Sequence, residues 1–408
     1  MLFLYTIGIQ VFYYLIRISS LFNSKAKKWV QGRKGLFNHL EKSISKTDEI
    51  IWFHCASLGE FEQGRPVLEA IKKLKPEFKI VLTFFSPSGY EVRKNYPLAD
   101  YVFYLPLDTR KNAEKFIHIV NPQMVVFVKY EFWYHFINEL YKKEIPLYIV
   151  SAIFRKDQHF FKNYGGWWRS MLKKTRHIFL QDEQSHQLLN SWGIQNSSVA
   201  GDTRFDRVYY AASVKESVPE VADFCANSTV FIAGSTWPED ENLLIDAIQK
   251  NASQWKFIIA PHEISSTRIK NLENSLKGIE IIKFSDLKNN ALESARVLII
   301  DNVGHLSKLY SYAQISYIGG GFGKGIHNIL EACAFGVPVI FGPNFNKFKE
   351  AKDLISKRGA FSIKNSLELD KILHNPLLNT AGKICLNYVD QNKGATEKIV
   401  GEIVHVLK

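Results

Sequence analysis

One segment of the chain reads Tyr317-Ile-Gly-Gly-Gly-Phe-Gly-Lys-Gly-Ile-His-Asn-Ile-Leu-Glu-Ala-Cys-Ala-Phe-Gly-Val-Pro-Val-Ile-Phe-Gly-Pro343. A short β-prone run ends at Ile318, and a glycine-rich loop follows it. From about His327 the pattern becomes helical, until Gly336 stops it. The segment therefore predicts a strand, a loop, a helix and a second strand, which together form a unit of an α/β fold.

The glycine-rich loop has two interpretations. Little side-chain bulk lets a ligand approach the backbone, and the first N–H groups of the following helix favour a phosphate. Glu331 shares a helix face with His327 and Asn328, so its carboxylate is placed to accept hydrogen bonds from a ribose diol. The alternative is an ordinary turn whose glycines serve close packing. A P-loop is excluded, because Lys324 is followed by Gly325 instead of Ser or Thr.

Apolar runs alternate with amphipathic stretches from Glu49 onward, which predicts parallel sheets covered by helices on both sides. The expected strands of a first domain are Ile50–Cys55, Lys79–Phe84, Tyr101–Leu105, Met124–Val128, Leu147–Val150 and His177–Leu180. Those of a second domain are Thr229–Ala233, Lys256–Ala260, Ile279–Lys283, Val297–Ile300, Ile315–Ile318 and Val337–Phe341.

The strand pattern divides the chain into two α/β domains, as its length of 408 residues also favours. We expect a first domain at 36–210, a polar linker at 211–227, a second domain at 228–390, and a final segment at 391–408 that contains a helix near Thr396–Leu407. Ligands of open α/β sheets bind beyond the carboxyl ends of the strands. Two such domains that face each other would form a cleft with a site on each wall.

The first residues of the chain are apolar, with no charged side chain before Arg17. Because a full membrane span needs about 20 residues, we expect residues 1–22 to form a short membrane anchor or a helix that lies in the interface. A hydrophobic helix packed on the protein is the alternative. The basic residues that follow place the remainder of the chain in the cytoplasm by the positive-inside rule; they are Lys25, Lys27, Lys28, Arg33 and Lys34.

The composition of the chain limits the classes of partner and the metal sites that we expect. The net charge of +12 favours an anionic partner, but the basic residues are dispersed and no nucleic-acid-binding module is present, so we expect no nucleic acid. The four cysteines are widely spaced, which argues for a reducing compartment and against a zinc site. His262-Glu263 is not followed by His at position 266, so a zinc-protease motif is excluded.

Candidate catalytic residues of the first wall lie where strands end. Glu60 follows the first strand, where it serves either as a catalytic carboxylate or as a helix-start acid worth roughly 0.3–1 kcal/mol. Glu131 follows another strand, either as a substrate contact or as a helix-start acid beside a packing Trp133. The polar loop Gly201–Asp206 holds either a third site or an Arg–Asp surface pair of little energetic worth.

On the second wall, Thr236 and Glu239 match a capping box, with Pro238 in the first helical turn. The same N–H groups and hydroxyls suit a phosphate, so capping and binding are compatible. Ala260–Glu263 ends the next strand and also faces the expected cleft.

Taken in order, these motifs resemble the 3-deoxy-D-manno-octulosonic acid (Kdo) transferases of lipopolysaccharide synthesis. The likeness spans nearly the whole chain and includes Gly32–Gly35, Ala56–Glu60, Glu131–Trp133, Phe205–Asp206, Gly234–Thr236 and His327–Pro343. Four positions depart from the family pattern: Lys129 replaces a common acidic residue, Tyr134 a usual Pro, Arg204 a usual Lys and Gly321 a usual Ser.

The resemblance implies an α/β GT-B fold, with two Rossmann-like domains that face each other across a cleft, and an inverting transfer of Kdo from CMP-Kdo to a lipid A precursor at the cytoplasmic face of the inner membrane. Expected partners are therefore CMP-Kdo, the lipid precursor and membrane lipids, and no metal or other cofactor is expected. The catalytic residues would be Glu60 as general base and Glu131 as a second carboxylate. Donor-binding residues would be Gly234, Ser235, Thr236, Pro261, His262, Gly319, Gly320, Gly321, Asn328 and Glu331. Acceptor-binding residues would be Ser57, Gly59 and Arg204.

Two other functions fit the same pattern. One is a different GT-B enzyme that acts on a UDP-sugar, either a transferase or an epimerase. The other is a membrane-bound protein that binds a lipid or a nucleotide without catalysis, in which case Glu60→Gln would leave nucleotide binding unchanged.

Overall fold

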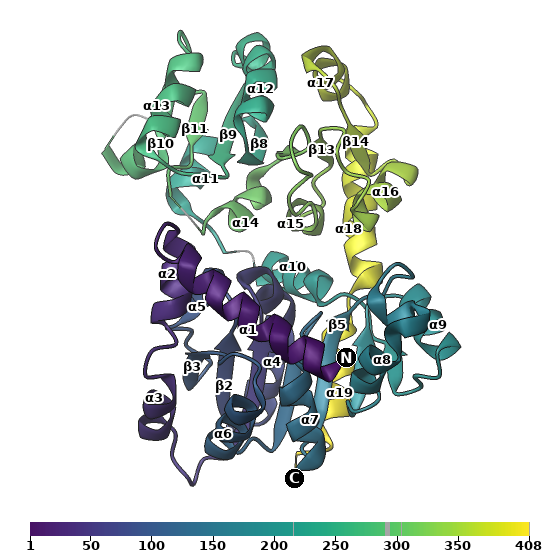
Figure 1. The fold of residues 1–408 in the computed structure, drawn as a ribbon. Coiled ribbons are helices and arrows are strands. Elements are labelled where there is room, and N and C mark those ends of the chain that lie inside the picture. Colours follow the sequence, from purple (N-terminus) through teal and green to yellow (C-terminus); the bar gives the residue numbers. More distant parts are fainter. Residues whose placement is uncertain (215, 290–293, 303, 408) are drawn as a thin grey trace. The chain divides into compact units, whose positions relative to one another are not determined.

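The computed structural model describes residues 1–214, 216–289, 294–302 and 304–407. The chain divides into two compact units, the first formed by Met1–Asp206 with Lys393–Lys408 and the second by Arg207–Asn392. Within the described residues, each unit contains a parallel sheet of seven strands. Figure 1 shows the helices of each unit packed on both faces of its sheet. The α/β class and the doubly wound, GT-B-type architecture expected from the sequence are therefore confirmed.

The sheet of the first unit has the strand order β3-β2-β1-β4-β5-β6-β7. Its strands are β1 (Ile50–Cys55), β2 (Lys79–Phe84), β3 (Tyr101–Tyr104), β4 (Met124–Val128), β5 (Leu147–Ala152), β6 (His177–Leu180) and β7 (Ser197–Val199). Neighbouring residues of β1 point to opposite faces, so Trp52 joins one buried apolar cluster and Phe53 joins the other. This double burial explains why the strands are continuous apolar runs.

The helices of the first unit begin with α1 (Leu2–Ser19), which lies against α2 (Figure 1). The others are α2 (Ser24–Gln31), α3 (Leu36–Ser43), α4 (Leu58–Leu74), α5 (Pro87–Arg93), α6 (Arg110–Val120), α7 (Tyr134–Lys142), α8 (Gly166–Leu172), α9 (Glu183–Ser191) and α19 (Ala395–Val404), with short 3₁₀ turns at His159–Phe161 and Asn163–Gly165. No residue of α1 is fully buried, and the helix is long and apolar enough to cross a membrane.

The sheet of the second unit has the order β10-β11-β9-β8-β12-β13-β14. Its strands are β8 (Thr229–Thr236), β9 (Trp255–Pro261), β10 (Ile281–Lys283), β11 (Val297–Ile299), β12 (Ile315–Ile318), β13 (Val339–Phe341) and β14 (Ala360–Ser362). Its helices are α11 (Pro219–Cys225), α12 (Pro238–Asn251), α13 (Ser266–Ser275), α14 (Leu306–Leu309), α15 (Leu330–Ala334), α16 (Lys349–Ser356), α17 (Ser366–Leu373) and α18 (Leu378–Asn392), with 3₁₀ turns at Phe284–Asn289 and Tyr310–Tyr312.

The predicted linker at 211–227 is mostly helical. Helix α10 (Thr203–Val214) runs through the boundary between the units, and α11 follows after a short connection. Only a narrow face of α10 is buried, at Thr203, Phe205 and Val208, so its sequence shows weak amphipathic patterning. A polar pattern here reflects exposed helices instead of an irregular linker.

The end of the chain returns to the first unit. Asp206 accepts hydrogen bonds from the backbone N–H groups of Gly394, at 2.5 Å, and Thr396, at 2.7 Å, where α19 begins. Apolar residues of α19, including Ile399 and Ile403, join a buried cluster with Phe61 of α4. The Phe205–Asp206 motif therefore fixes the position of α19, which the sequence did not indicate.

Helix α15 is shorter than predicted, because it begins at Leu330 and not near His327. The residues before it are held by the glycine-rich loop: the N–H of His327 donates to the carbonyl oxygen of Gly319 at 3.1 Å. The side chain of Asn328 accepts from the N–H of Leu330 at 3.1 Å, which makes a turn before the helix. The expected proximity of Asn328 and Glu331 is present, at 3.2 Å between the amide nitrogen and a carboxylate oxygen.

Candidate active site

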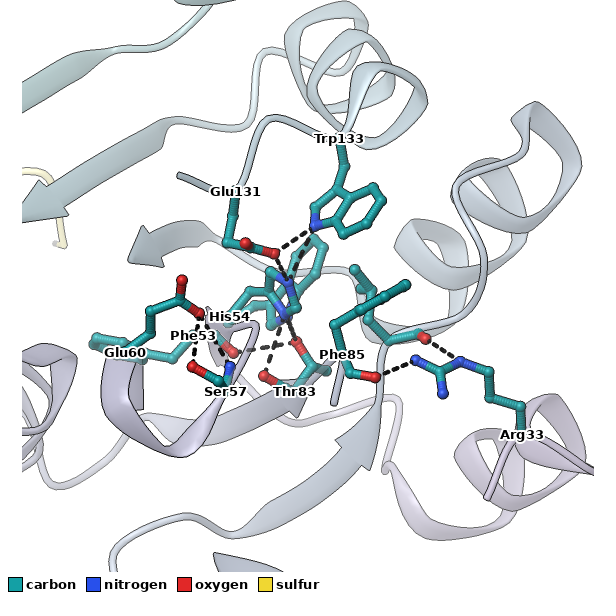
Figure 2. Close-up of polar contacts among 11 residues, drawn as sticks. Arg33, Phe53, His54, Ser57, Glu60, Thr83, Phe85, Glu131 and Trp133 are labelled. Carbon is teal, nitrogen blue, oxygen red and sulfur yellow. Dashed lines mark hydrogen bonds and ion pairs between the residues drawn. The ribbon is translucent and has the colours of Figure 1, made fainter. Parts of the chain in front are cut away.

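Glu60 lies in the first turn of α4, directly after the carboxyl end of β1. Ser57 precedes the helix, and its backbone N–H donates to Glu60 Oε2 at 3.0 Å. Figure 2 shows the second carboxylate oxygen of Glu60 directed away from Ser57. The capping interaction thus holds the side chain in place through one oxygen. The neighbouring Gly59 is exposed, and a Cβ added there would have no heavy atom within 4 Å, so the backbone at this turn is open to a ligand.

Glu131 belongs to a buried network that joins three strands (Figure 2). Its Oε2 atom lies 2.8 Å from Nε2 of His54 at the end of β1, and it accepts from the indole Nε1 of Trp133 at 2.7 Å. On its other side, His54 Nδ1 lies 2.9 Å from the hydroxyl oxygen of Thr83 in β2. Trp52 completes the chain by donating to that same oxygen at 2.8 Å. The network fixes the carboxylate of Glu131 and the ring of His54 in single orientations.

The electrostatic environment of Glu60 suits a base. Burial raises the pKa of its carboxyl group above the ordinary range, and the negative charge of Glu131 raises it further. The neighbouring His54 and the hydrogen bonds from the turn lower the pKa of Glu60 and so act in the opposite direction. A carboxylate whose proton affinity is raised in this way is a better acceptor of a proton from a hydroxyl group.

Basic groups lie on the same side of the sheet as Glu60. Burial lowers the pKa of Lys129 at the end of β4, and the charges of Arg204, Asp202, Glu60 and Arg155 also act on it. Lys129 adopts the left-handed backbone region, with a φ of 71°, which is uncommon outside glycine. Arg204 donates through Nε to Asp202 at 2.8 Å, and Asp202 is buried, so this pair is not the exposed surface pair considered above.

Arg33, from the loop after α2, clamps the edge of this site (Figure 2). Its guanidinium donates to the carbonyl oxygens of Leu105 and Phe85, each at 2.8 Å. It also lies 3.8 Å from the ring centroid of Trp29, where a cation–π contact forms. Burial lowers the pKa of Arg33 to about 9. The clamp fixes the segments that follow β2 and β3, one of which carries Phe85.

In the second unit, Asp240 ties together the ends of two strands. Its carboxylate accepts from the backbone N–H of Trp237 at 2.9 Å, the hydroxyl of Tyr317 at 2.7 Å and the N–H of Gly320 at 2.8 Å. The predicted capping box of Thr236 and Glu239 is therefore wrong by one position. Strand β8 continues through Thr236, whose hydroxyl donates to the carboxylate of Glu241 at 2.7 Å. Pro238 occupies the first helical turn, as expected.

The glycine-rich loop packs closely against other backbone. The N–H of Gly319 donates to the carbonyl oxygen of Gly234 at 2.9 Å. A Cβ added to Gly319 would lie 2.2 Å from the carbonyl oxygen of Ser235, and one added to Gly321 would lie 2.5 Å from the nitrogen of Gly342. The N–H groups of Gly319 and Gly320 thus bond within the unit, and the glycines permit strand ends to approach.

An aromatic stack lies beside this loop. The indole Nε1 of Trp237 donates to Nε2 of His327 at 2.9 Å, and the rings of His327 and His262 stack with centroids 4.3 Å apart. Burial and the neighbouring His262 lower the pKa of His327. A neutral His327 ring is also the form that accepts the hydrogen bond from the indole of Trp237, so the lowered pKa and the hydrogen bond agree.

The predicted donor-binding residues fall into two groups by exposure. Gly234, Thr236, Pro261, Gly319, Gly320 and Gly321 are buried, whereas Ser235, Asn328 and Glu331 are partly exposed and His262 is exposed. Ser235 has a φ of 54°, in the left-handed region, where β8 shifts register against β9. The four accessible side chains are the ones able to touch a ligand. Within the described residues, no cluster of three or more His, Cys, Asp or Glu side chains is arranged to hold a metal ion.

A family model of 3-deoxy-D-manno-octulosonic-acid transferase (kdotransferase) matches residues 29–207, which include Arg33, Glu60 and Glu131. The chain also resembles the 3-deoxy-D-manno-octulosonic acid transferase of Rickettsia typhi, with 28% identity over 90% of this chain and 81% of that one. Both comparisons point to the Kdo transferases, so the resemblance expected from the sequence is confirmed.

A relative from Aquifex aeolicus with the same description is 28% identical over 81% of this chain and 86% of its own length. Among solved structures, UDP-GlcNAc 2-epimerase from Neisseria meningitidis superposes with a TM-score of 0.58 at 15% identity, covering 88% of this chain and 99% of the other. That likeness shows a shared fold. The similarity to these transferases supports a glycosyltransferase enzyme, as the sequence predicted.

Sequence reasoning missed His54 and Arg155 as members of this candidate site. His54 is a fully buried polar residue within the apolar run of β1, and that contrast was a signal available in the sequence. Arg155 lies after β5, and its charge acts on both Lys129 and Tyr130. No local pattern marks it, because the fold alone brings it near the end of β4.

Proposed function

We propose that the protein is an inverting glycosyltransferase that moves Kdo from CMP-Kdo to a hydroxyl group of a lipid A precursor. The observation that carries this proposal is the Glu60 carboxylate, which is held through one oxygen at the carboxyl edge of the first sheet beside the buried Glu131–His54 pair. The similarity of the chain to the Kdo transferases supports the choice of sugar and donor.

In the proposed reaction, Glu60 is the general base. A sugar hydroxyl is a poor nucleophile, and the ionised carboxylate removes its proton as the new bond to the anomeric carbon of Kdo forms. The bond from that carbon to the phosphate oxygen breaks, and CMP leaves with the electron pair. Because the nucleophile attacks from the face opposite the leaving group, the configuration at the anomeric carbon inverts.

Glu131 is the second carboxylate of the proposal. Its oxygen is held by both Trp133 and His54, and the side chain is buried, so it acts on the reaction mainly through its charge and through the groups that it orients. The negative charge stabilises a developing oxocarbenium ion and maintains the high proton affinity of Glu60.

The donor is assigned to the second unit. We place the ribose of CMP near Glu331 and its phosphate near Ser235 and Asn328, with His262 of the aromatic stack as a further contact. The buried glycines shape this surface, and the proposal does not rely on their N–H groups, two of which already have partners. CMP as a leaving group carries less charge than a nucleoside diphosphate, so the proposal includes no metal.

The location that we propose is the cytoplasmic face of the inner membrane. Helix α1 is apolar along its length, and the exposed lysines of α2 directly follow it. Such a basic segment is retained on the cytoplasmic side and attracts anionic headgroups.

The test is a transfer assay with CMP-Kdo and a tetraacylated, bisphosphorylated lipid A precursor, in which CMP release and the mass of the lipid are both followed. Glu60→Gln is expected to lower kcat by about 10²–10⁴-fold and to leave the affinity for CMP-Kdo near that of the native protein. Glu69→Gln, which removes a carboxylate farther along α4, is the matched control and is expected to retain native activity.

UDP-GlcNAc serves as the competing donor in the same assay. Turnover of UDP-GlcNAc without any gain of Kdo mass would refute the proposal and leave a nucleotide-sugar enzyme of another specificity. Equal Kdo transfer by the native protein and Glu60→Gln would retain the reaction but remove Glu60 as its base.

A further inference from the structure

An apolar cavity of about 520 Å³ lies within the first unit, between α1 and the body of the unit. One wall is a face of α1, and the opposite wall is aromatic. The lining residues are Met1, Leu4, Tyr5, Gly8, Ile9, Phe12, Phe85, Trp133, Trp167 and Trp168. Its volume lies in the range of roughly 300–1,000 Å³ that is usual for small-ligand sites. The cavity is open to the surface, since Met1 and Leu4 at its rim are 53% and 64% exposed.

Two polar groups of the lining are directed to other partners. The hydroxyl of Tyr5 donates to the buried carboxylate of Asp108, and the indole N–H of Trp133 donates to Glu131. The indole Nε1 atom of Trp167 is buried without a hydrogen-bond partner among the described residues. The rest of the lining is mainly hydrocarbon and aromatic rings, a surface that suits a flexible apolar chain.

The cavity shares a wall with the proposed catalytic site. Trp133 lines the cavity with its ring and binds Glu131 with its Nε1 atom, at 2.7 Å. Phe85, another lining residue, is held by the Arg33 clamp. The centroids of the Phe85 and Trp133 rings are 4.7 Å apart. The side chain of Trp133 alone therefore separates an occupant of the cavity from the carboxylate of Glu131.

The same contacts hold α1 in place. Asp108, which receives the Tyr5 hydroxyl, also accepts from the backbone N–H groups of His135 and Phe136 in the first turn of α7, each at 3.1 Å. Trp133 stands immediately before that helix. Helix α1 is thus tied to the segment that positions Trp133 and Glu131, which goes beyond what a membrane anchor alone would need.

We propose that this cavity binds one acyl chain of the lipid acceptor, so that α1 forms part of the acceptor site as well as an anchor. The inference rests on the proposed function. An acceptor chain fits better than a chain of a bulk membrane lipid for two reasons. The acceptor must present a hydroxyl group to Glu60, and the cavity wall formed by Trp133 binds Glu131, whose charge acts on Glu60; the two phosphates of the acceptor complement the exposed lysines that follow α1.

The test compares two phenylalanine substitutions on the same helix. Gly8 lines the cavity, and a Cβ added to it would meet no heavy atom within 4 Å, so Gly8→Phe fills the space without a backbone clash. Val11 is 50% exposed and does not line the cavity, so Val11→Phe is the control that introduces the same side chain on the same helix outside the cavity. Acceptors with one headgroup and progressively shorter acyl chains are supplied in detergent micelles.

For the native protein, kcat/KM is expected to rise with chain length by up to about fourfold per methylene, the equivalent of roughly 0.8 kcal/mol. Gly8→Phe is expected to remove most of this dependence while the KM for CMP-Kdo stays unchanged. Val11→Phe is expected to behave as the native protein does. Trp168→Ala enlarges the cavity from the opposite wall and is expected to shift the preference to longer chains.

Two results would overturn the inference. One is an unaltered chain-length dependence in Gly8→Phe. The other is an equal loss of activity toward all acceptors, together with weaker binding of Gly8→Phe to acceptor-free phosphatidylethanolamine–phosphatidylglycerol vesicles, because that result would assign the cavity to a membrane lipid. Failure of the proposed function is distinct, since the native protein would then transfer Kdo to none of these acceptors.

Discussion

Glu60 and Asp240 occupy the same local position in the two units. Each is the third residue of the helix that follows the first strand of its sheet, and each accepts the N–H of the residue before that helix, at 3.0 Å for Glu60 and 2.9 Å for Asp240. The surroundings differ. Asp240 is 1% exposed and accepts from Tyr317 and Gly320 as well, whereas Glu60 is only partly buried.

The difference teaches how one capping device serves two purposes. At Asp240 the carboxylate is enclosed by donors from two strand ends, so it stabilises the junction of β8, α12 and the glycine-rich loop. At Glu60 the cap fixes the side chain and leaves a carboxylate oxygen directed away from it (Figure 2). A capping motif in a sequence therefore does not distinguish a structural acid from a catalytic one. The number of hydrogen-bond donors around the carboxylate and the burial of the side chain do distinguish them.

The largest effect that tests this comparison is on stability. Asp240→Ala leaves three buried donors without their acceptor and is expected to lower the free energy of unfolding by about 3–5 kcal/mol. Glu60→Ala loses chiefly a cap and is expected to lower it by about 1 kcal/mol. Denaturant unfolding of the intact protein measures both values, and hydrogen exchange at the Gly320 amide reports the local opening.

Asp246→Ala, at an exposed position of α12, is the control and is expected to stay within about 0.5 kcal/mol of the native protein. Equal losses for Asp240→Ala and Glu60→Ala would contradict the division of roles between the two acids.

A smaller effect distinguishes the glycines of the two regions. Gly319→Ala places a Cβ 2.2 Å from the carbonyl oxygen of Ser235, so strand ends must separate, and a loss of about 1–3 kcal/mol is expected. Gly59→Ala meets open space in the first turn of α4 and is expected to be neutral or to stabilise by up to about 1 kcal/mol. Thermal unfolding of the two variants beside the native protein measures the difference.

Gly59→Ala carries a second readout. If the acceptor approaches the α4 turn as proposed, the added methyl group raises the KM for the lipid and leaves that for CMP-Kdo unchanged. A stabilised variant with native acceptor kinetics would remove Gly59 from the proposed acceptor site.

Much of the fold could be predicted from the sequence because its strands are buried on both faces. The predicted bounds of β1, β2, β4, β6 and β12 agree with the structure residue for residue. The strands β7 and β14 were missed. Each has three residues and lies at a sheet edge, and only one residue of each is buried, so neither produces an apolar run.

The site was harder to predict than the fold. Glu60 and Glu131 were noticed because each ends an apolar strand, and a single sequence contains that information. The link between Glu131 and His54 joins residues 77 positions apart through the order of the strands, and no spacing rule encodes it. The glycine-rich loop shows a different limit: the N–H donors of Gly319 and Gly320 are satisfied within the unit, and close packing together with the positive φ of Gly320 accounts for glycine there, so a glycine pattern alone does not distinguish packing from ligand binding.

The smallest predicted effect concerns the pH dependence of the reaction and joins the two carboxylates of the first unit. Burial is the main reason that the pKa of Glu60 is raised, and the charge of Glu131 is the second. As the proposed base, Glu60 must be ionised, so kcat/KM rises as the pH rises through its pKa. Glu131→Gln removes a negative neighbour, which favours ionised Glu60 and lowers its pKa. The acid limb of the kcat/KM profile is therefore expected to move to lower pH, at a reduced maximal rate, while Glu69→Gln leaves the limb in place. A limb that stays fixed in Glu131→Gln would mean that the titrating base is a group other than Glu60, and a limb that moves to higher pH would reverse the assigned sign of the coupling between the two acids.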